Sequence, residues 1–285
     1  MTMENKYLIK KDLKVIIEES EYSIDDIAKK TGVSSRTLDN ILSESVIPNN
    51  DIIDKIYSYA YDEGYRFNKV KEEIFKETYN KLVLFHGASK TIEEIKASGS
   101  RDNCDFGNGF YLGETYSQAS SFVYDVPLSS VYSFAFDLTD LKVVKFETNI
   151  EWMLLVCHFR KMINEFDNNS IILDLLSKIK DADVIIAPIA DNKMFNIMRQ
   201  FGEGDITTIQ AIHSLASSGL GNQYVLKTEK AISHLKEIER LFISSSERQA
   251  ISKIMEDRGT EIDTKLKLSK REFRGEGQYI DELFK

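Results

Sequence analysis

Apolar side chains in the N-terminal part of the chain recur every three or four positions, and no alternating pattern interrupts them before about Tyr65. This spacing is that of one face of an α-helix. The positions that show it are Leu13, Ile16 and Ile17, then Ile24, Ile27 and Ala28, then Leu38, Ile41 and Leu42. Ser23 and Ser34 stand where helix N-caps are expected, and Gly32 stands where a turn or C-cap glycine is expected. The pattern therefore predicts short helices joined by tight turns.

Beyond a polar helix predicted over residues 68–81, short apolar runs alternate with helical periodicity. Segments rich in Val, Ile, Phe and Tyr are typical of strands, and they cover 82–86, 109–112, 130–137, 143–146, 183–188 and 223–228. Helices are predicted between them, over 91–97, 116–123, 150–166, 171–180, 192–201 and 207–216. After Thr228 the chain is predicted to be helical again, with one apolar face formed by Ala231, Leu235, Ile238 and Phe242.

These patterns divide the chain into three predicted parts. An all-α module covers about residues 1–75, an α+β domain covers 79–240, and a helical extension covers 241–285. At a typical size of about 150 residues per domain, a chain of 285 residues accommodates two domains, or one large domain with an appendage. We find no internal repeat and no low-complexity segment.

Composition narrows the class of protein. Apolar residues make up 42% and charged residues 29%, as in ordinary globular proteins. The longest apolar runs are far shorter than the roughly 18 residues of a membrane span, and the N-terminus has no apolar signal segment. The two cysteines lack partners at metal-ligand or disulfide spacing. We therefore expect a cytoplasmic protein with no membrane contact and no metal.

The stretch SIDDIAKKTGVSSRTLDNIL resembles the helix-turn-helix of phage-repressor-like proteins. Its packing positions are Ile24, Ala28, Gly32, Val33, Leu38 and Ile41. A recognition helix over residues 34–43 would present outward Ser35, Arg36, Asp39 and Asn40, which is one cation and one acid for a phosphate backbone. The net charge of −9 also opposes general attraction to nucleic acids. DNA binding through residues 23–43 is thus weakly supported, and the alternative is a small module that packs on a partner or on the rest of the chain.

Three short segments each place a polar side chain in an apolar or glycine-flanked strand. They are LFHGAS with His86, DFGNGFYLG with Tyr111, and GNQYVLKT with Gln223. Their order and spacing resemble the ADP-ribosyltransferase superfamily, in the branch of poly-ADP-ribose polymerases and diphtheria-type toxins. With DADVIIAPIADN and the helix of Trp152, residues 82–235 resemble an uncharacterised bacterial family of that superfamily with a His-Tyr-Gln motif.

The resemblance implies a split β-sandwich of two packed sheets and NAD as substrate. It assigns His86 to a hydroxyl of the adenine ribose, the backbone of Gly87 to the nicotinamide carboxamide, and the ring of Tyr111 to stacking on nicotinamide. A glycine at position 87 would let the ligand approach the main chain closely. Ser89 is expected near the ribose, and Arg101 near the diphosphate.

The chemistry of the reaction agrees with these residue types. Breaking the nicotinamide–ribose bond passes through a cation-like state, so a site must hold nicotinamide and offer hydrogen-bond acceptors to the ribose. Taken singly, His86 is more typical of a core residue, Tyr111 of a half-buried strand aromatic, and Gln223 of a polar residue on an edge strand.

Gln223 departs from the polymerase pattern, which has glutamate there. An amide cannot act as a general base, whose absence typically costs about a hundred- to ten-thousand-fold in rate. Chain elongation is then disfavoured, whereas single transfer to a reactive acceptor or to water remains open. Asp191 is the preferred accessory carboxylate because it ends a predicted strand beside a turn, and the other candidates are Glu114, Asp105 and Glu282.

The sequence thus predicts an NAD-dependent mono-ADP-ribosyltransferase, with the catalytic residues His86, Tyr111 and Gln223. We expect a bacterial toxin or defence effector that modifies a protein or nucleic acid, with an antitoxin or regulator as a possible partner. One alternative is an NAD glycohydrolase, in which water replaces the acceptor. The other is a catalytically degenerate regulator that senses a nucleotide and binds DNA or a partner protein.

Overall fold

The computed structural model describes residues 7–190, 192–216 and 221–285. The N-terminal module consists of the helices α1 (Ile9–Ser20), α2 (Ile24–Thr31), α3 (Ser35–Leu42) and α4 (Asn50–Asp62). The predicted caps are confirmed: the side chains of Ser23 and Ser34 accept hydrogen bonds from backbone N–H groups of α2 and α3, and Gly32 ends α2 with φ 67°. A left-handed residue of this kind suits glycine because it has no Cβ.

The rest of the chain is mixed α+β, as predicted. Helix α5 (Phe67–Thr78) leads into the strands β1 (Leu82–Ala88), β2 (Phe110–Gly113), β3 (Ser130–Phe136), β4 (Val143–Lys145), β5 (Val184–Pro188), β6 (Asn222–Leu226) and β7 (Leu235–Phe242). The other helices are α6 (Tyr116–Ser120), α7 (Ile150–Phe159), α8 (Ser170–Ile179), α9 (Asn192–Gly202), α10 (Thr208–Ala216), α11 (Glu229–Ser233), α12 (Ser245–Glu272) and α13 (Ile280–Leu283), with a 3-10 turn at Asn164–Phe166.

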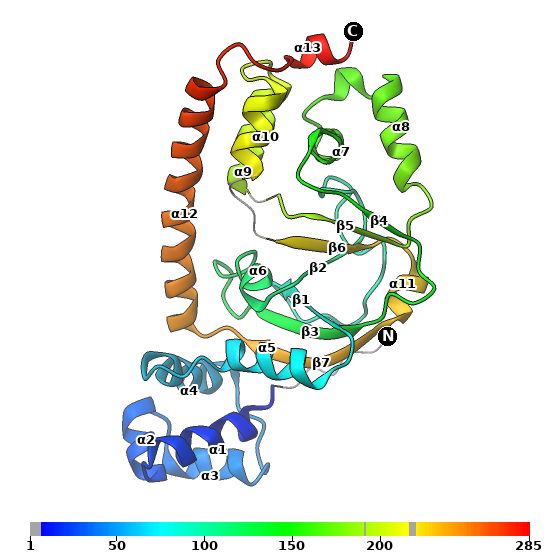
Figure 1. The fold of residues 1–285 in the computed structure, drawn as a ribbon. Helices are drawn as coiled ribbons and strands as arrows, with labels where there is room; N and C mark the ends of the chain where they lie inside the picture. The colour runs from blue at the N-terminus through cyan, green and yellow to red at the C-terminus, as the bar shows by residue number, and fades with distance from the viewer. Residues whose placement is uncertain (1–6, 191, 217–220) are drawn as a thin grey trace.

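The strands differ from the expectation of two separate packed sheets. Those of the described chain form one seven-stranded sheet in the order β4-β5-β6-β2-β1-β3-β7. Its two halves join between β1 and β2, where the described strands have one registered pair, Phe85 opposite Gly113. Figure 1 shows β1, β3 and β7 below and β4, β5 and β6 above. This antiparallel junction merges what would otherwise be two sheets.

The apolar helix α7 forms the centre of the largest core. Its side chains from Trp152 to Cys157 are buried almost completely, and the indole Nε1 of Trp152 donates to the carbonyl of Pro188 at 3.2 Å. Helices α8, α9, α10 and α12 also contribute to this core. The end of β5 is therefore fixed against α7.

Two predicted helices are wrong. Residues 91–97 are not helical, because tertiary partners take their backbone N–H groups: the hydroxyl of Tyr132 accepts from Ile92 at 3.2 Å, and the carboxylate of Glu229 accepts from Ala97 at 2.8 Å. The continuous helix predicted after Thr228 ends at Ser233, and β7 follows it.

The error at β7 has a local cause. The strand pairs with β3, and its register shifts so that Glu237 and Glu239 face consecutive residues of β3, leaving Ile238 as the extra residue of a bulge. A bulge changes which side chains share a face. The apolar spacing of β7 therefore imitates a helix.

Buried charges attach the N-terminal module to the sheet. The ammonium of Lys71 on α5 lies 2.6 Å from a carboxylate oxygen of Asp12 on α1 and 2.5 Å from one of Glu239 on β7. The hydroxyl of Tyr57 on α4 also donates to Asp12. Burial raises the pKa of Glu239, and the charge of Lys71 opposes that rise. Phe242 at the end of β7 stacks on Tyr57.

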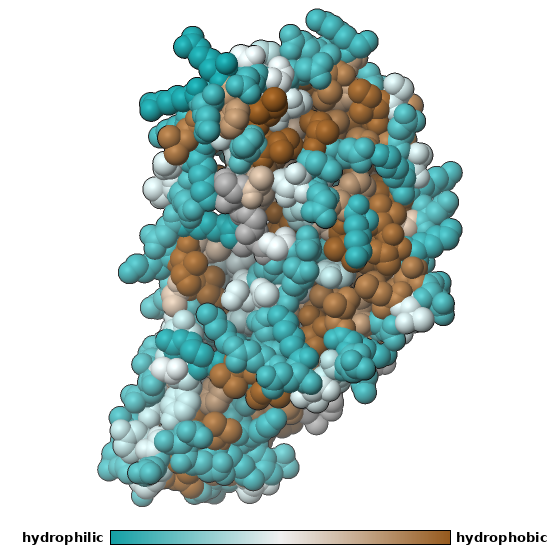
Figure 2. All heavy atoms as spheres, viewed as in Figure 1, coloured by the Kyte–Doolittle hydropathy of each residue, from teal (hydrophilic) through white to brown (hydrophobic). Residues whose placement is uncertain are grey.

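The surface differs between the two ends of the molecule. Figure 2 shows that the N-terminal helices, at the lower end of the view, are mainly hydrophilic, whereas apolar areas lie on the larger part above them. Among the described residues, no helix has both the length and the apolar character needed to cross a membrane.

We expect Lys71→Met to lower the free energy of unfolding by about 3–5 kcal/mol, since it leaves two buried carboxylates without their cation. Urea unfolding followed by circular dichroism measures this change. Lys69→Met, at an exposed position of the same helix, should change it by less than about 0.5 kcal/mol. Equal effects of the two substitutions would show that the buried network does not stabilise the fold.

Candidate functional site

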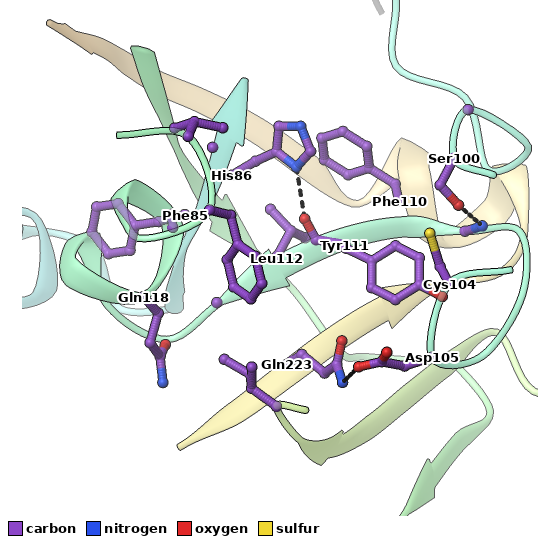
Figure 3. A pocket seen from close by; sticks show the side chains of 18 of the residues that line it. Phe85, His86, Ser100, Cys104, Asp105, Phe110, Tyr111, Leu112, Gln118 and Gln223 are labelled. Carbon is purple, nitrogen blue, oxygen red and sulfur yellow. Dashed lines mark hydrogen bonds between the residues drawn. The ribbon is translucent and has the colours of Figure 1, made fainter. Parts of the chain in front are cut away.

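A cavity of about 610 Å³ opens where β1, β2 and β6 meet the segment before β2. Its lining includes the sequence-predicted residues His86, Gly87, Ser89, Arg101, Tyr111 and Gln223. Adjacent strands bring the three motif side chains together: β1 carries His86, β2 carries Tyr111, and β6 carries Gln223. In Figure 3 the imidazole of His86 lies beside the ring of Phe110, whereas the side chains of Tyr111 and Gln223 lie on the side of Asp105. Asp191 lies outside the described residues.

The imidazole of His86 has a defined protonation and orientation. Its Nδ1 lies 2.7 Å from the backbone carbonyl of Tyr111, which can only accept, so Nδ1 carries the proton. The ring stacks on Phe110 with the centroids 4.4 Å apart. Burial lowers the pKa of His86, which favours the neutral ring near pH 7. Its Nε2 is therefore a hydrogen-bond acceptor.

The hydroxyl of Tyr111 is used to hold the loop before β2. It donates to the carbonyl of Gly107 at 2.6 Å and accepts from the backbone N–H of Phe106 at 3.1 Å. Burial raises the pKa of Tyr111, so the hydroxyl stays protonated. With the hydroxyl fixed in this way, the ring is a rigid aromatic wall of the cavity.

The amide of Gln223 is held by two acceptors. Its Nε2 donates to a carboxylate oxygen of Asp105 at 2.8 Å and to the carbonyl of Pro188 at 3.0 Å. Because both partners accept, the nitrogen must face them and Oε1 points the other way. Figure 3 shows the nitrogen toward Asp105 and the oxygen on the side of Tyr111. Gln223 therefore presents an acceptor to the cavity.

Arg160, which sequence reasoning missed, completes this part of the site. Its Nε and Nη2 donate to one oxygen of Asp105 at 2.9 and 2.7 Å, and its guanidinium lies over the ring of Phe195. Burial raises the pKa of Asp105, and the charge of Arg160 opposes that rise. The pair is 55 residues apart in the chain, so no spacing in the sequence indicates it. The sequence indicates Asp105 only as one of the candidate accessory carboxylates, after Asp191.

The remaining predicted residues separate into two groups. Ser89 and Arg101 are exposed at the cavity. Glu114 instead accepts from the backbone and side-chain nitrogens of Asn222, and Glu282 caps α13 by accepting from the backbone N–H of Tyr279. In the described part of the chain, no three His, Cys, Asp or Glu side chains are grouped to hold a metal ion.

Gly87 is required by the fold itself. A Cβ at this position would lie 2.2 Å from the carbonyl oxygen of Ala119 on α6, a distance that side chains do not reach without movement of the backbone. The resemblance explains a glycine at position 87 by the close approach of a ligand to the main chain. The structure adds a reason that needs no ligand, because α6 packs directly on β1.

The family of the chain follows from residues 82–236, which contain the strands β1 to β6, the first two residues of β7 and all three motif side chains. They match the model of a family described as "Protein of unknown function (DUF3990)". The match covers more than half of the chain, so the chain belongs to this family. No curated protein and no solved structure matches the chain.

We expect Gly87→Ala to lower the free energy of unfolding by at least about 1–3 kcal/mol through overpacking against α6. Thermal or urea unfolding measures the loss. Gly99→Ala is the matched control, because its Cβ would have one close neighbour, the carbonyl oxygen of Lys96 at 3.1 Å, which a shift of a few tenths of an ångström accommodates. A Gly87→Ala protein as stable as this control would contradict the packing argument.

Proposed function

We propose that this chain is an NAD-dependent mono-ADP-ribosyltransferase of the poly-ADP-ribose-polymerase and diphtheria-toxin type. The observation that carries the proposal is that His86, Tyr111 and Gln223, far apart in the sequence, line one cavity of about 610 Å³. This volume lies within the range of about 300–1,000 Å³ that is typical of small-molecule sites. We also propose that the domain has the split β-sandwich form of that superfamily, with the β1–β2 junction between its halves.

Each of the three side chains offers the kind of contact that NAD needs. The Nε2 of His86 accepts from a hydroxyl of the adenine ribose. The ring of Tyr111 stacks on nicotinamide, and the backbone of Gly87 pairs with the carboxamide. The Oε1 of Gln223 accepts from a hydroxyl of the nicotinamide ribose. Ser89 and Arg101, at the exposed side of the cavity, would contact the ribose and the diphosphate.

In the proposed reaction the bond between C1 of the ribose and the nicotinamide nitrogen breaks, and its electron pair leaves with nicotinamide. A nucleophilic atom of the acceptor then bonds to C1 and loses its proton to solvent. The oxygen of Gln223 stabilises the cation-like ribose through its dipole. Because an amide takes no proton at neutral pH, the acceptor must already be a good nucleophile. This favours one transfer to a protein or nucleic acid, as in a toxin or defence effector.

The N-terminal module is proposed as a docking or regulatory part. Arg36 and Asp39 are exposed on α3, but acidic side chains outnumber basic ones over residues 1–63, which opposes binding to a polyanion. The module is also attached to the sheet through Lys71. DNA binding through residues 23–43 is therefore not part of the proposal.

Incubation with NAD labelled in the adenylate tests the reaction. We expect release of nicotinamide and transfer of the label to protein or nucleic acid of a bacterial lysate. Free ADP-ribose alone would indicate an NAD glycohydrolase, and a rise in melting temperature without nicotinamide release would indicate a nucleotide sensor. If NAD releases no nicotinamide and does not raise the melting temperature, all three hypotheses are overturned.

Substitutions of Tyr111 test the stacking role. Tyr111→Leu should lower kcat/KM for nicotinamide release by about 10- to 100-fold, since base–aromatic stacking contributes about 1–3 kcal/mol. Tyr111→Phe keeps the ring and loses the bonds to Gly107 and Phe106, so we expect it to reduce stability by about 1 kcal/mol with a smaller loss of rate. Tyr22→Leu, at an exposed tyrosine of the N-terminal module, is the control. Equal rates for the Leu and Phe variants at position 111 would argue against stacking.

A further inference from the structure

Asp105 is held in the cavity wall by donors on three elements. One oxygen accepts from Nε and Nη2 of Arg160, and the other accepts from the amide of Gln223. The backbone N–H of Ala190, which follows β5, is a further donor. The residue is 4% exposed. Because its acceptor positions are occupied, Asp105 is not placed to take a proton from an acceptor molecule.

This arrangement determines which end of the Gln223 amide faces the cavity. A primary amide fits its site in two orientations that exchange a donor for an acceptor. The carbonyl of Pro188 accepts from the indole of Trp152 and from Nε2 of Gln223. The same Nε2 also donates to Asp105. The charged hydrogen bond to Asp105 is the stronger of the two. It therefore has the larger part in keeping the nitrogen in the wall and the oxygen in the cavity.

We propose that Asp105, itself fixed by Arg160, is the positioning residue that turns the oxygen of Gln223 toward the substrate. The inference rests on the proposed function, in which that oxygen accepts from a ribose hydroxyl. It assigns to Asp105 a role that acts through Gln223 and requires no contact with NAD.

The same geometry makes a carboxylate at position 223 unfavourable. In Gln223→Glu, the new carboxylate would meet that of Asp105 at the position of the present 2.8 Å contact. The carbonyl of Pro188 would lose the donor that the amide nitrogen supplies. Like charges at such a distance raise the pKa of one group, so a shared proton at lower pH would restore a hydrogen bond. Of the other charged or titratable groups, Arg160 acts directly on Asp105. The charge of Asp105 also acts on Tyr111, as do Cys104 and Arg160.

Four proteins test the inference: the wild type, Asp105→Asn, Gln223→Glu and the double variant. In the double variant the side chain at position 105 supplies the N–H and the one at position 223 accepts it, so the contact is rebuilt with opposite polarity and unchanged net charge. Asp102→Asn, at an exposed position of the same loop, is the matched control. The readouts are the melting temperature and the kcat and KM of nicotinamide release. They are measured between about pH 5.5 and 8, the range in which proteins are usually most stable.

We expect each single substitution to lower the melting temperature by about 5 °C or more, as removal of one partner of a buried charged contact should. Each should lower kcat by about tenfold or more, with a smaller change in KM, because the contact acts on the reacting ribose. The double variant should recover at least half of the lost melting temperature and exceed Gln223→Glu in kcat. The activity of Gln223→Glu relative to the wild type should rise as pH falls.

Two results would count against different parts of this scheme. Additive losses of melting temperature, with no recovery of kcat in the double variant, would overturn the positioning role. A different result would be that the double variant recovers melting temperature but no protein of the set, the wild type included, releases nicotinamide. That result would overturn the NAD function and leave a purely structural contact between Asp105 and Gln223.

Discussion

The pairing of β1 with β2 has a single registered pair within these described strands, and the cavity depends on this short junction. Phe85 faces Gly113, but the next residues along β1 separate from β2 and line the cavity. A buried carbonyl that loses its ladder partner needs another donor. The imidazole of His86 supplies it by donating to the carbonyl of Tyr111. One side chain thus closes the gap in the backbone pairing and forms part of the site.

The rest of the site is held in the same manner, by side chains that satisfy backbone or buried polar groups. The hydroxyl of Tyr111 fixes the loop before β2, and Gln223 joins that loop to the end of β5 through Asp105 and Pro188. Arg160 extends the connection to α7. Groups held this firmly lose little entropy when a ligand binds, which is the physical meaning of preorganisation.

The sequence predicted the elements and the motif residues better than the connections between them. The caps at Ser23 and Ser34 and most strands follow from local pattern, and His86, Tyr111 and Gln223 followed from short motifs. Local pattern failed at β7, where the bulge at Ile238 imitates helical spacing. It also gave no sign of Arg160, because a buried ion pair between distant segments depends on the fold and leaves no periodicity in the sequence.

The end of β7 limits how the N-terminal helical module can be exchanged between related proteins. Phe242 belongs to the core of the N-terminal helices, and Ser245, at the start of α12, binds the carboxylate of Asp54 through its backbone N–H and its hydroxyl. A gene fragment that encoded only the sheet and α12 would produce a protein with an uncovered aromatic strand end. Exchange of the helical module between related genes should therefore succeed only when the complementary strand end is exchanged with it.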